Sequence, residues 1–206
     1  MFWNEKIKMW YYGSSQSNQR NEKDGIDVNM EDKAVERVFK VINKMYQEGT
    51  LKDYAVGGAV ATIYYTEPFA TKDIDIFFIP PEKDKIILLT PFYDFLLKKG
   101  YKTYKEYIMI GEVPIQFIPT ATELEKEAVE KAISVKYKNI DVKILRPEYL
   151  VAIFLDVFRA KDRDKLIKLL DQAKIDKALL KNILARHNLD KKYDDFMEKY
   201  YGWSDY

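Results

Sequence analysis

Hydrophobic positions from residue 31 onward change repeatedly between helix spacing and strand spacing. Apolar residues three or four apart predict a helix from Glu31 to the glycine at 49. Further helices are expected at 59–65, 83–99, 123–132 and from Pro147 to the C-terminus, with an interruption near Pro91 left open. Strand-like runs beside turn residues lie at 54–56, 73–79, 104–110, 113–118, 134–137 and 141–145. The pattern predicts an α+β protein, in which a mixed β-sheet flanked by helices is followed by a C-terminal helical bundle.

The first thirty residues differ from the rest of the chain. Aromatic residues crowd the first twelve positions, and Gly, Ser, Asn, Gln and charged residues follow. Either these aromatic side chains dock back on the domain, or they form an arm for a partner, such as a second copy in a dimer. We therefore divide the chain into an N-terminal arm (1–30), an α/β core (31–146) and a C-terminal helical region (147–206).

Composition excludes several classes of site. Lys and Arg number 34 against 33 Asp and Glu, so the whole chain is not a strongly basic nucleic-acid clamp. The absence of cysteine excludes a disulfide scaffold, a thiol nucleophile and a cysteine zinc site. The single histidine, His187, rules out a His-rich metal cluster and is expected on the surface or at a helix cap. We see no signal peptide and no run near the ~18 apolar residues of a membrane span, so we expect a cytoplasmic protein without a membrane partner.

Two short motifs carry the chemistry. Asp73 and Asp75 are two residues apart on a predicted strand, so they face the same side about 7 Å apart. A divalent cation, Mg²⁺ or Mn²⁺, would relieve their repulsion. Gly57 and Gly58 end one strand and open a helix, where free backbone N–H groups suit phosphate. Together the motifs indicate metal-assisted phosphoryl or nucleotidyl transfer.

The Gly-Gly and Asp-x-Asp pair resembles the nucleotidyltransferase superfamily of the polymerase-β type. Within it, the chain is most similar to the AbiEii-type toxins and to related small bacterial and archaeal proteins. The resemblance continues at 113–119 and at 146–152, and at 159–164 it is similar to the family's Arg-x-Lys-Asp-x-x-Asp stretch. It spans residues 33–170 and leaves residues 1–30 outside.

The resemblance implies transfer of a nucleotidyl group from a magnesium–NTP complex to a hydroxyl of RNA, protein or a small molecule. Asp73 and Asp75 would hold the metal, and Gly57 and Gly58 would seat the β- and γ-phosphates. Lys72 or Lys161 would neutralise the leaving pyrophosphate. The role implied for Asp164 is to orient the acceptor or support the site. A toxin of a toxin–antitoxin or phage-defence pair is one implied setting.

Three positions depart from the family pattern. Gln116 occupies the position of a third carboxylate, and an amide cannot act as a general base. Phe154 stands where AbiEii-type members tend to carry Lys, and Gly58 where Ser is frequent. An alternative is therefore a catalytically impaired protein of the same fold that acts as a nucleotide-binding or protein-interaction module.

Other interpretations stay open. A nuclease or phosphatase would use the same carboxylate pair with further acidic ligands from other strands. Each motif also has a structural interpretation: a solvated strand start at Asp73 and Asp75, a tight turn at Gly57-Gly58, and a solvated helix face at 161–164.

Overall fold

The computed structural model describes residues 3, 6–7, 28–80 and 90–202. Within these residues seven strands form one sheet in the order β3-β4-β5-β2-β1-β7-β6. The strands are β1 (Asp53–Val56), β2 (Ile74–Ile79), β3 (Lys102–Tyr104), β4 (Tyr107–Ile110), β5 (Val113–Pro119), β6 (Ile133–Tyr137) and β7 (Ile140–Ile144). The helices are α2 (Val28–Gln47), α3 (Gly58–Tyr65), α4 (Thr90–Lys98), α5 (Glu123–Glu130), α6 (Pro147–Val157), α7 (Ala160–Gln172), α8 (Lys177–Arg186) and α9 (Asp190–Tyr201).

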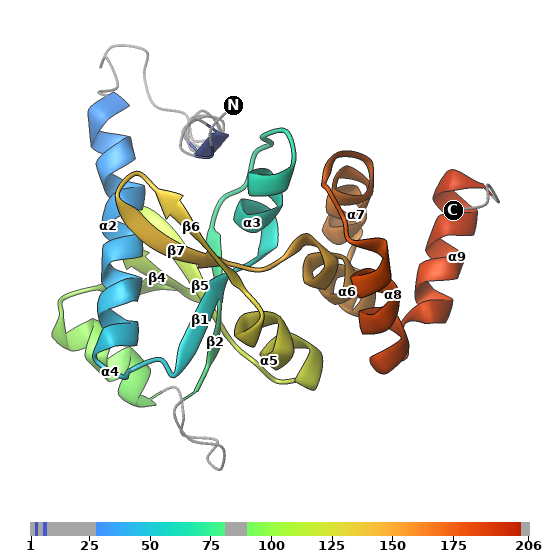
Figure 1. Cartoon of the computed structure of the whole chain (residues 1–206). Coiled ribbons are helices and arrows are strands. Elements are labelled where there is room, and N and C mark those ends of the chain that lie inside the picture. The colour runs from blue at the N-terminus through green and yellow to red at the C-terminus, as the bar shows by residue number, and fades with distance from the viewer. Residues whose placement is uncertain (1–2, 4–5, 8–27, 81–89, 203–206) are drawn as a thin grey trace.

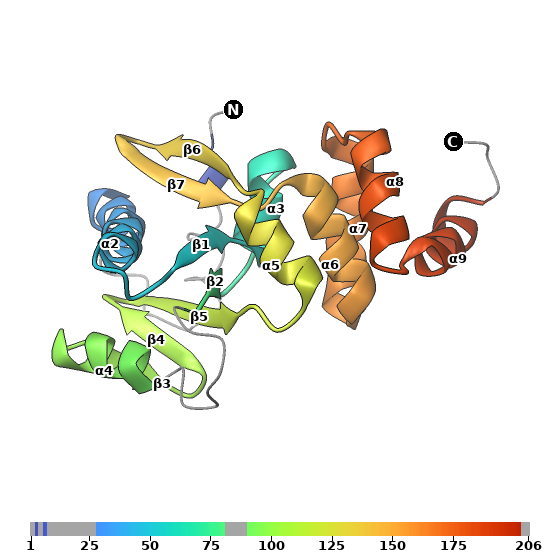
Figure 2. The same ribbon diagram turned by 60° about the horizontal axis from the view of Figure 1, so that its bottom comes forward.

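The sheet is mixed, as the sequence predicts. β2 pairs in parallel with β5 and β1 with β7, whereas β1–β2, β3–β4, β4–β5 and β6–β7 are antiparallel. In both Figure 1 and Figure 2, α2 lies on one side of the sheet and α6 to α9 lie on the other. The predicted α+β class, with a helix-flanked mixed sheet and a C-terminal group of helices, is confirmed.

Alternating residues of β2 enter two different hydrophobic cores. Ile74, Ile76 and Phe78 pack in a core with α2, whereas Phe77 and Ile79 pack in a second core with α5 to α9. Successive side chains of a strand point to opposite faces, so a strand covered on both sides is apolar in both phases. This explains why the predicted 73–79 strand is apolar on both faces after its first residues.

The described part of the N-terminal arm docks on the domain. Trp3 and Ile7 are buried in the core that contains α2. The Trp3 ring stacks on Phe39 and meets Tyr64 and Tyr137 edge-on. Of the two interpretations of the arm, docking on its own chain therefore holds for these residues.

Two predicted elements need correction. The strand expected at 104–110 is two strands, β3 and β4, which turn at Lys105 and Glu106 and pair antiparallel. The helix expected at 83–99 is described from Thr90 to Lys98, and its predicted start at 83–89 lies outside the described residues.

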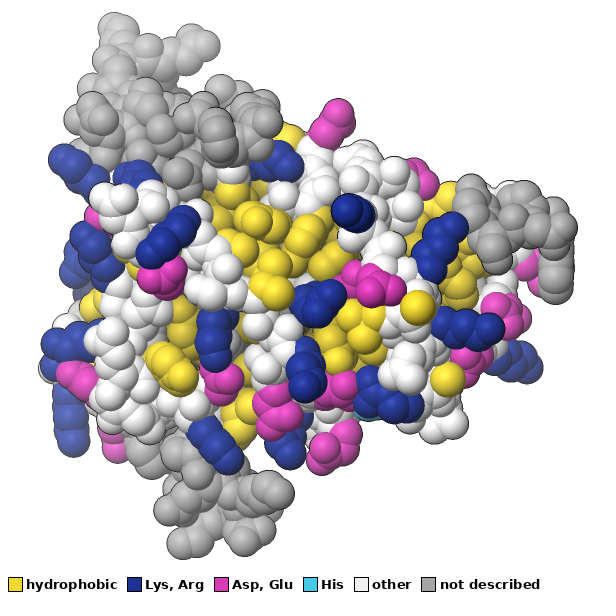
Figure 3. All heavy atoms as spheres, in the orientation of Figure 1, with side chains coloured by type: hydrophobic (Ala, Val, Ile, Leu, Met, Phe, Trp, Pro, Cys, Tyr) yellow, Lys and Arg dark blue, Asp and Glu magenta, His cyan; other side chains and the backbone are white. Residues whose placement is uncertain are grey.

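Charges of both signs are interspersed on the face shown in Figure 3. This distribution fits a chain with a formal net charge of +1. Among the helices that the structure describes, none is long and apolar enough to cross a membrane.

Candidate active site

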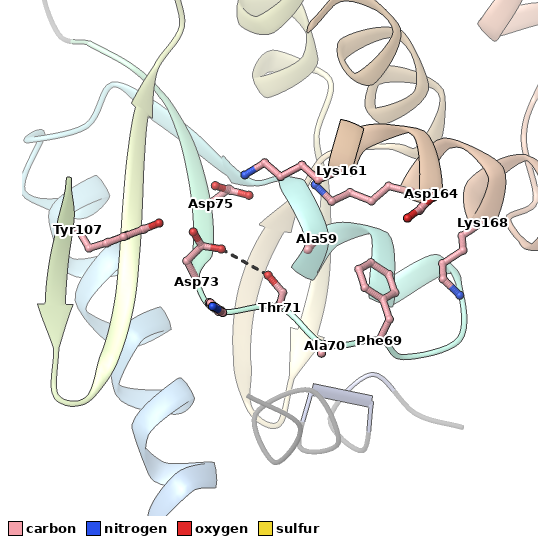
Figure 4. A pocket seen from close by; sticks show the side chains of 12 residues that line it. Ala59, Phe69, Ala70, Thr71, Asp73, Asp75, Tyr107, Lys161, Asp164 and Lys168 are labelled. Carbon is pink, nitrogen blue, oxygen red and sulfur yellow. Dashed lines mark hydrogen bonds between the residues drawn. The ribbon is translucent and has the colours of Figure 1, made fainter. Parts of the chain in front are cut away.

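The two aspartates enter the site because of the register of β2. Asp73 comes directly before the strand, and Asp75 is its second residue. Both share the strand phase of Phe77 and therefore lie on the face of the sheet that the C-terminal helices cover. Both side chains line one cleft of about 390 Å³ (Figure 4).

The cleft brings together segments that are far apart in the sequence. Of the residues predicted from the sequence, Lys72, Asp73, Asp75, Lys161 and Asp164 all line it. The cleft is also lined by side chains to which the sequence did not point, among them Phe69, Tyr107, Lys165 and Lys168. Helix α7 supplies Asp164 and the lysines at 161, 165 and 168, whereas Lys72 precedes β2 and Tyr107 lies on β4.

Gly57 and Gly58 make room for neighbouring side chains. A Cβ at Gly58, where φ is +53°, would overlap the carboxylate of Asp75, and a Cβ at Gly57 would overlap the Phe77 ring. The backbone N–H of Gly57 also donates to the carbonyl of Asp75 at 2.9 Å. The glycines thus let Asp75 lie against the first residue of α3. Their predicted contact with phosphate stays a prediction.

The Asp75 carboxyl has an unusual proton affinity. Its burial, and then the nearby charge of Asp73, raise its pKa to about 6, against the opposing effect of Lys165 and Lys161. Two carboxylates in one cleft are therefore costly to ionise together, and a cation placed between them would lower that cost.

A fully buried carboxylate holds the first turn of α7. Asp162 accepts hydrogen bonds from the backbone N and the Nε of Arg159, at 3.1 and 2.8 Å, and from Nζ of Lys165 at 3.2 Å. Burial alone would raise the pKa of Asp162, but these bonds and charges outweigh it and lower the pKa. Asp162 therefore fixes the turn from which Lys161 and Lys165 reach the cleft.

Lys165 lies close to Phe154. Its Nζ is 4.9 Å from the centre of the Phe154 ring, and its side chain is only 12% exposed. Lys161, Lys165 and Lys168 are four and three residues apart, so they share one face of α7. That face lines the cleft.

Asp164, Gln116 and Tyr107 differ in how they relate to the carboxylate pair. Asp164 is 75% exposed and lies 3.7 Å from Nε of Arg163. Gln116 is the register partner of Asp75 on the adjacent parallel strand β5. The Tyr107 hydroxyl points toward Asp73 (Figure 4), and burial together with the Asp73 charge raises its pKa to about 12.

The donor set suits a cation that arrives with its substrate. Among the described residues, no three His, Asp or Glu side chains form a cluster able to hold a metal ion. Mg²⁺ typically keeps several waters and binds one or two carboxylates together with substrate phosphates. Asp73 and Asp75, side by side on an open cleft, fit that mode of binding.

Comparisons with known proteins give similarities of structure alone. No family model matches the chain, and no curated protein matches it in sequence. The chain is similar to an antigenic nucleotidyltransferase-like protein from Paracoccidioides brasiliensis, with 14% identity, a TM-score of 0.49, and coverage of 81% of this chain and 91% of that chain. It is also similar to ANT(2")-Ia, solved in complex with adenylyl-2"-tobramycin, with 14% identity, a TM-score of 0.40, and coverage of 79% and 98%.

Proposed function

We propose that the cleft binds a nucleoside triphosphate with Mg²⁺ or Mn²⁺ and transfers a nucleotidyl group to a hydroxyl acceptor. One observation carries the proposal: a carboxylate pair from β2 and cations from α7 line the same open cleft. Metal-assisted phosphoryl chemistry needs those two kinds of group together, to hold the metal and to meet the charge on the phosphates.

The acidic and the basic side chains of the cleft have different roles in this proposal. Asp73 and Asp75 would hold the cation, which when bound polarises the phosphoryl oxygens. The ammonium groups of Lys161 and Lys165 would face the pyrophosphate as its bond to the α-phosphorus breaks. The acceptor oxygen forms the new bond to that phosphorus, and its proton passes to a carboxylate or to water. The exposed Asp164 is suited to orient an acceptor entering from solvent.

The acceptor class stays open in this proposal between RNA, a protein and a small molecule. As part of this proposal we expect a protein of the AbiEii type that acts in a toxin–antitoxin or phage-defence pair. We also expect it to be cytoplasmic.

Two residues favour a second candidate, a nucleotide-binding or protein-interaction module that has lost catalysis. Gln116, beside Asp75, offers an amide in place of a third carboxylate. Phe154 offers an uncharged ring where the resemblance implies a lysine. Both positions therefore lack a charged group that the resemblance implies.

Calorimetric titration with each of the four NTPs, with and without Mg²⁺, tests the proposal. We expect binding that needs Mg²⁺ and is lost in the Asp73→Asn/Asp75→Asn double variant. Asp141→Asn, which removes a carboxylate on β7 that pairs with Lys136, is the control and should bind as the wild type does. Failure of every NTP to bind the wild type would rule the proposal out. Pyrophosphate release with acceptors present then separates an enzyme from a binding module.

A further inference from the structure

The cleft has two chemically different ends. Asp73, Asp75 and Tyr107 form one end, and Phe69 and Lys168 lie on the opposite side of Ala59 in Figure 4. A ligand that fills the whole cleft therefore needs a part that suits carboxylates and a part that suits an aromatic ring with a cation. The volume of the cleft, about 390 Å³, lies within the range of small-molecule sites.

Phe69 offers an aromatic surface to this cleft. It lies in the segment between α3 and β2, is half-buried, and packs at the edge of the core that contains α2. Figure 4 shows its ring among the side chains that line the cleft. A phenyl ring carries no hydrogen-bonding group, so what it can offer a ligand is an apolar face for stacking.

Lys168 marks the same end with a positive charge. Its Nζ is 5.5 Å from the centre of the Phe69 ring, and within the described ranges no carboxylate forms a salt bridge with it. Lys165, one turn earlier, differs because it pairs with the buried Asp162. A cation over a partly exposed ring is held weakly, more weakly than a nucleobase that stacks on the same ring. An entering base can therefore displace the Lys168 ammonium toward an anionic part of the ligand.

We infer that Phe69 is the stacking face for the base of a nucleotide whose phosphates extend toward Asp73 and Asp75, with Lys168 beside it. This inference rests on the proposed function. It assigns the base end of the ligand to the segment between α3 and β2 and to α7.

The test separates base from phosphate by using two ligands. Wild-type protein and variants are titrated with each NTP and with inorganic tripolyphosphate, all with Mg²⁺. Phe69→Leu removes the aromatic face, and Phe69→Trp keeps one. Phe95→Leu is the matched control, because Phe95 is also half-buried at the edge of the same core and has Lys99 Nζ 5.4 Å from its ring centre.

We expect Phe69→Leu to weaken NTP binding about 5- to 150-fold, the range of one base–aromatic stack, and to leave tripolyphosphate binding unchanged. Phe69→Trp and Phe95→Leu should keep the wild-type affinity for both ligands. The inference is overturned if Phe69→Leu weakens neither ligand or weakens both equally, even where the Asp73→Asn/Asp75→Asn result supports the proposed function. A wild-type protein that binds no NTP overturns both. Melting temperatures of the two leucine variants show whether either has lost its fold.

Discussion

At the scale of single residues, Gly58 decides where the Asp75 carboxylate lies. Its φ of +53° is in the left-handed region, and its α-carbon faces the Asp75 carboxylate with no room for a Cβ. Gly49 provides a matched position, since its φ is +73° and nothing lies within 4 Å of a Cβ placed there. Both glycines have a positive φ, but only at Gly58 would a Cβ overlap another side chain.

We predict that Gly58→Ala lowers the free energy of unfolding more than Gly49→Ala does. The left-handed conformation costs an L-residue about 1–2 kcal/mol at either position. At Gly58 the new methyl group also displaces Asp75, and such overpacking typically adds about 1–3 kcal/mol. Urea denaturation of both variants measures the difference. Equal losses would mean that the Asp75 carboxylate moves aside without cost.

The sequence predicted the residues whose placement depends on local geometry. Asp73 and Asp75 face one side because a strand has a period of two, and Lys72 lies next to them. Phe69 and Tyr107 reach the cleft through tertiary packing, for which the sequence carries no local signal. Lys165 had a signal, since it is four residues after Lys161 and three before Lys168 on one helix face.

At the scale of elements, one carboxylate connects three helices. Glu127 on α5 accepts hydrogen bonds from Nη1 and Nη2 of Arg186 on α8, both at 2.6 Å, and from the Tyr149 hydroxyl on α6 at 2.7 Å. His187, the C-cap residue of α8, lies 3.1 Å from the same carboxylate, in agreement with its predicted capping role. The hydrogen bonds from Arg186 are the largest cause of a fall in the pKa of Glu127 to about 2.

We predict that this cluster makes stability sensitive to acid. Because the Glu127 pKa is lower in the folded chain than the ordinary ~4.3, the unfolded chain binds more protons between about pH 2 and pH 4.5. The contribution of Glu127 is therefore fully present above that window and is lost as the pH falls through it. Glu127→Gln should lower the melting temperature at pH 7 and flatten its dependence on pH between 5 and 2.

The control for this prediction lies on the same helix. Glu130 is half-exposed, and its 4.0 Å contact with Lys126 Nζ is a weak surface ion pair. Glu130→Gln should therefore leave the pH dependence of the melting temperature unchanged. Melting curves recorded from pH 7 to 2 for both variants and the wild type measure the effect. Parallel curves for wild type and Glu127→Gln would contradict the prediction.

The strand predicted at 104–110 was wrong because the turn between β3 and β4 contains no residue typical of turns. The β4–β5 turn contains Gly111 with φ +66°, the residue type that such a turn favours, and the sequence predicted it. The β3–β4 turn instead places Lys105 at φ +55°. Lysine is not a turn marker, so the 104–110 run read as one continuous strand.

At the scale of the whole molecule, the cleft depends on how two cores meet at the sheet. The core of α5 to α9 holds α7 near the face that carries Asp73 and Asp75. The sequence predicted both the sheet and the C-terminal helices. It could not show that α7 packs beside α3, because that contact arises from the packing of residues about a hundred positions apart.

The N-terminal arm adds a further long-range connection, at the C-terminal end of α3. Lys6 Nζ donates to the carbonyl of Thr66 at 2.7 Å, at the C-cap of α3 and shortly before the segment that lines the cleft. Trp3 is buried against Phe39 and Tyr137, and its Nε1 has no hydrogen-bond partner in the part of the chain that the structure describes. The segment thus joins α2, α3 and β6.

We predict that Trp3→Ala lowers the free energy of unfolding by about 3–5 kcal/mol, the usual loss for a large buried aromatic side chain. Trp3→Phe is the matched control, and it should cost much less because it keeps an aromatic ring and removes the N–H that has no partner. Chemical denaturation of both variants measures these losses. Sedimentation velocity on the wild type tests the other interpretation of the arm, in which it joins two copies in a dimer. A Trp3→Ala protein as stable as the wild type would show that the segment does not support the fold.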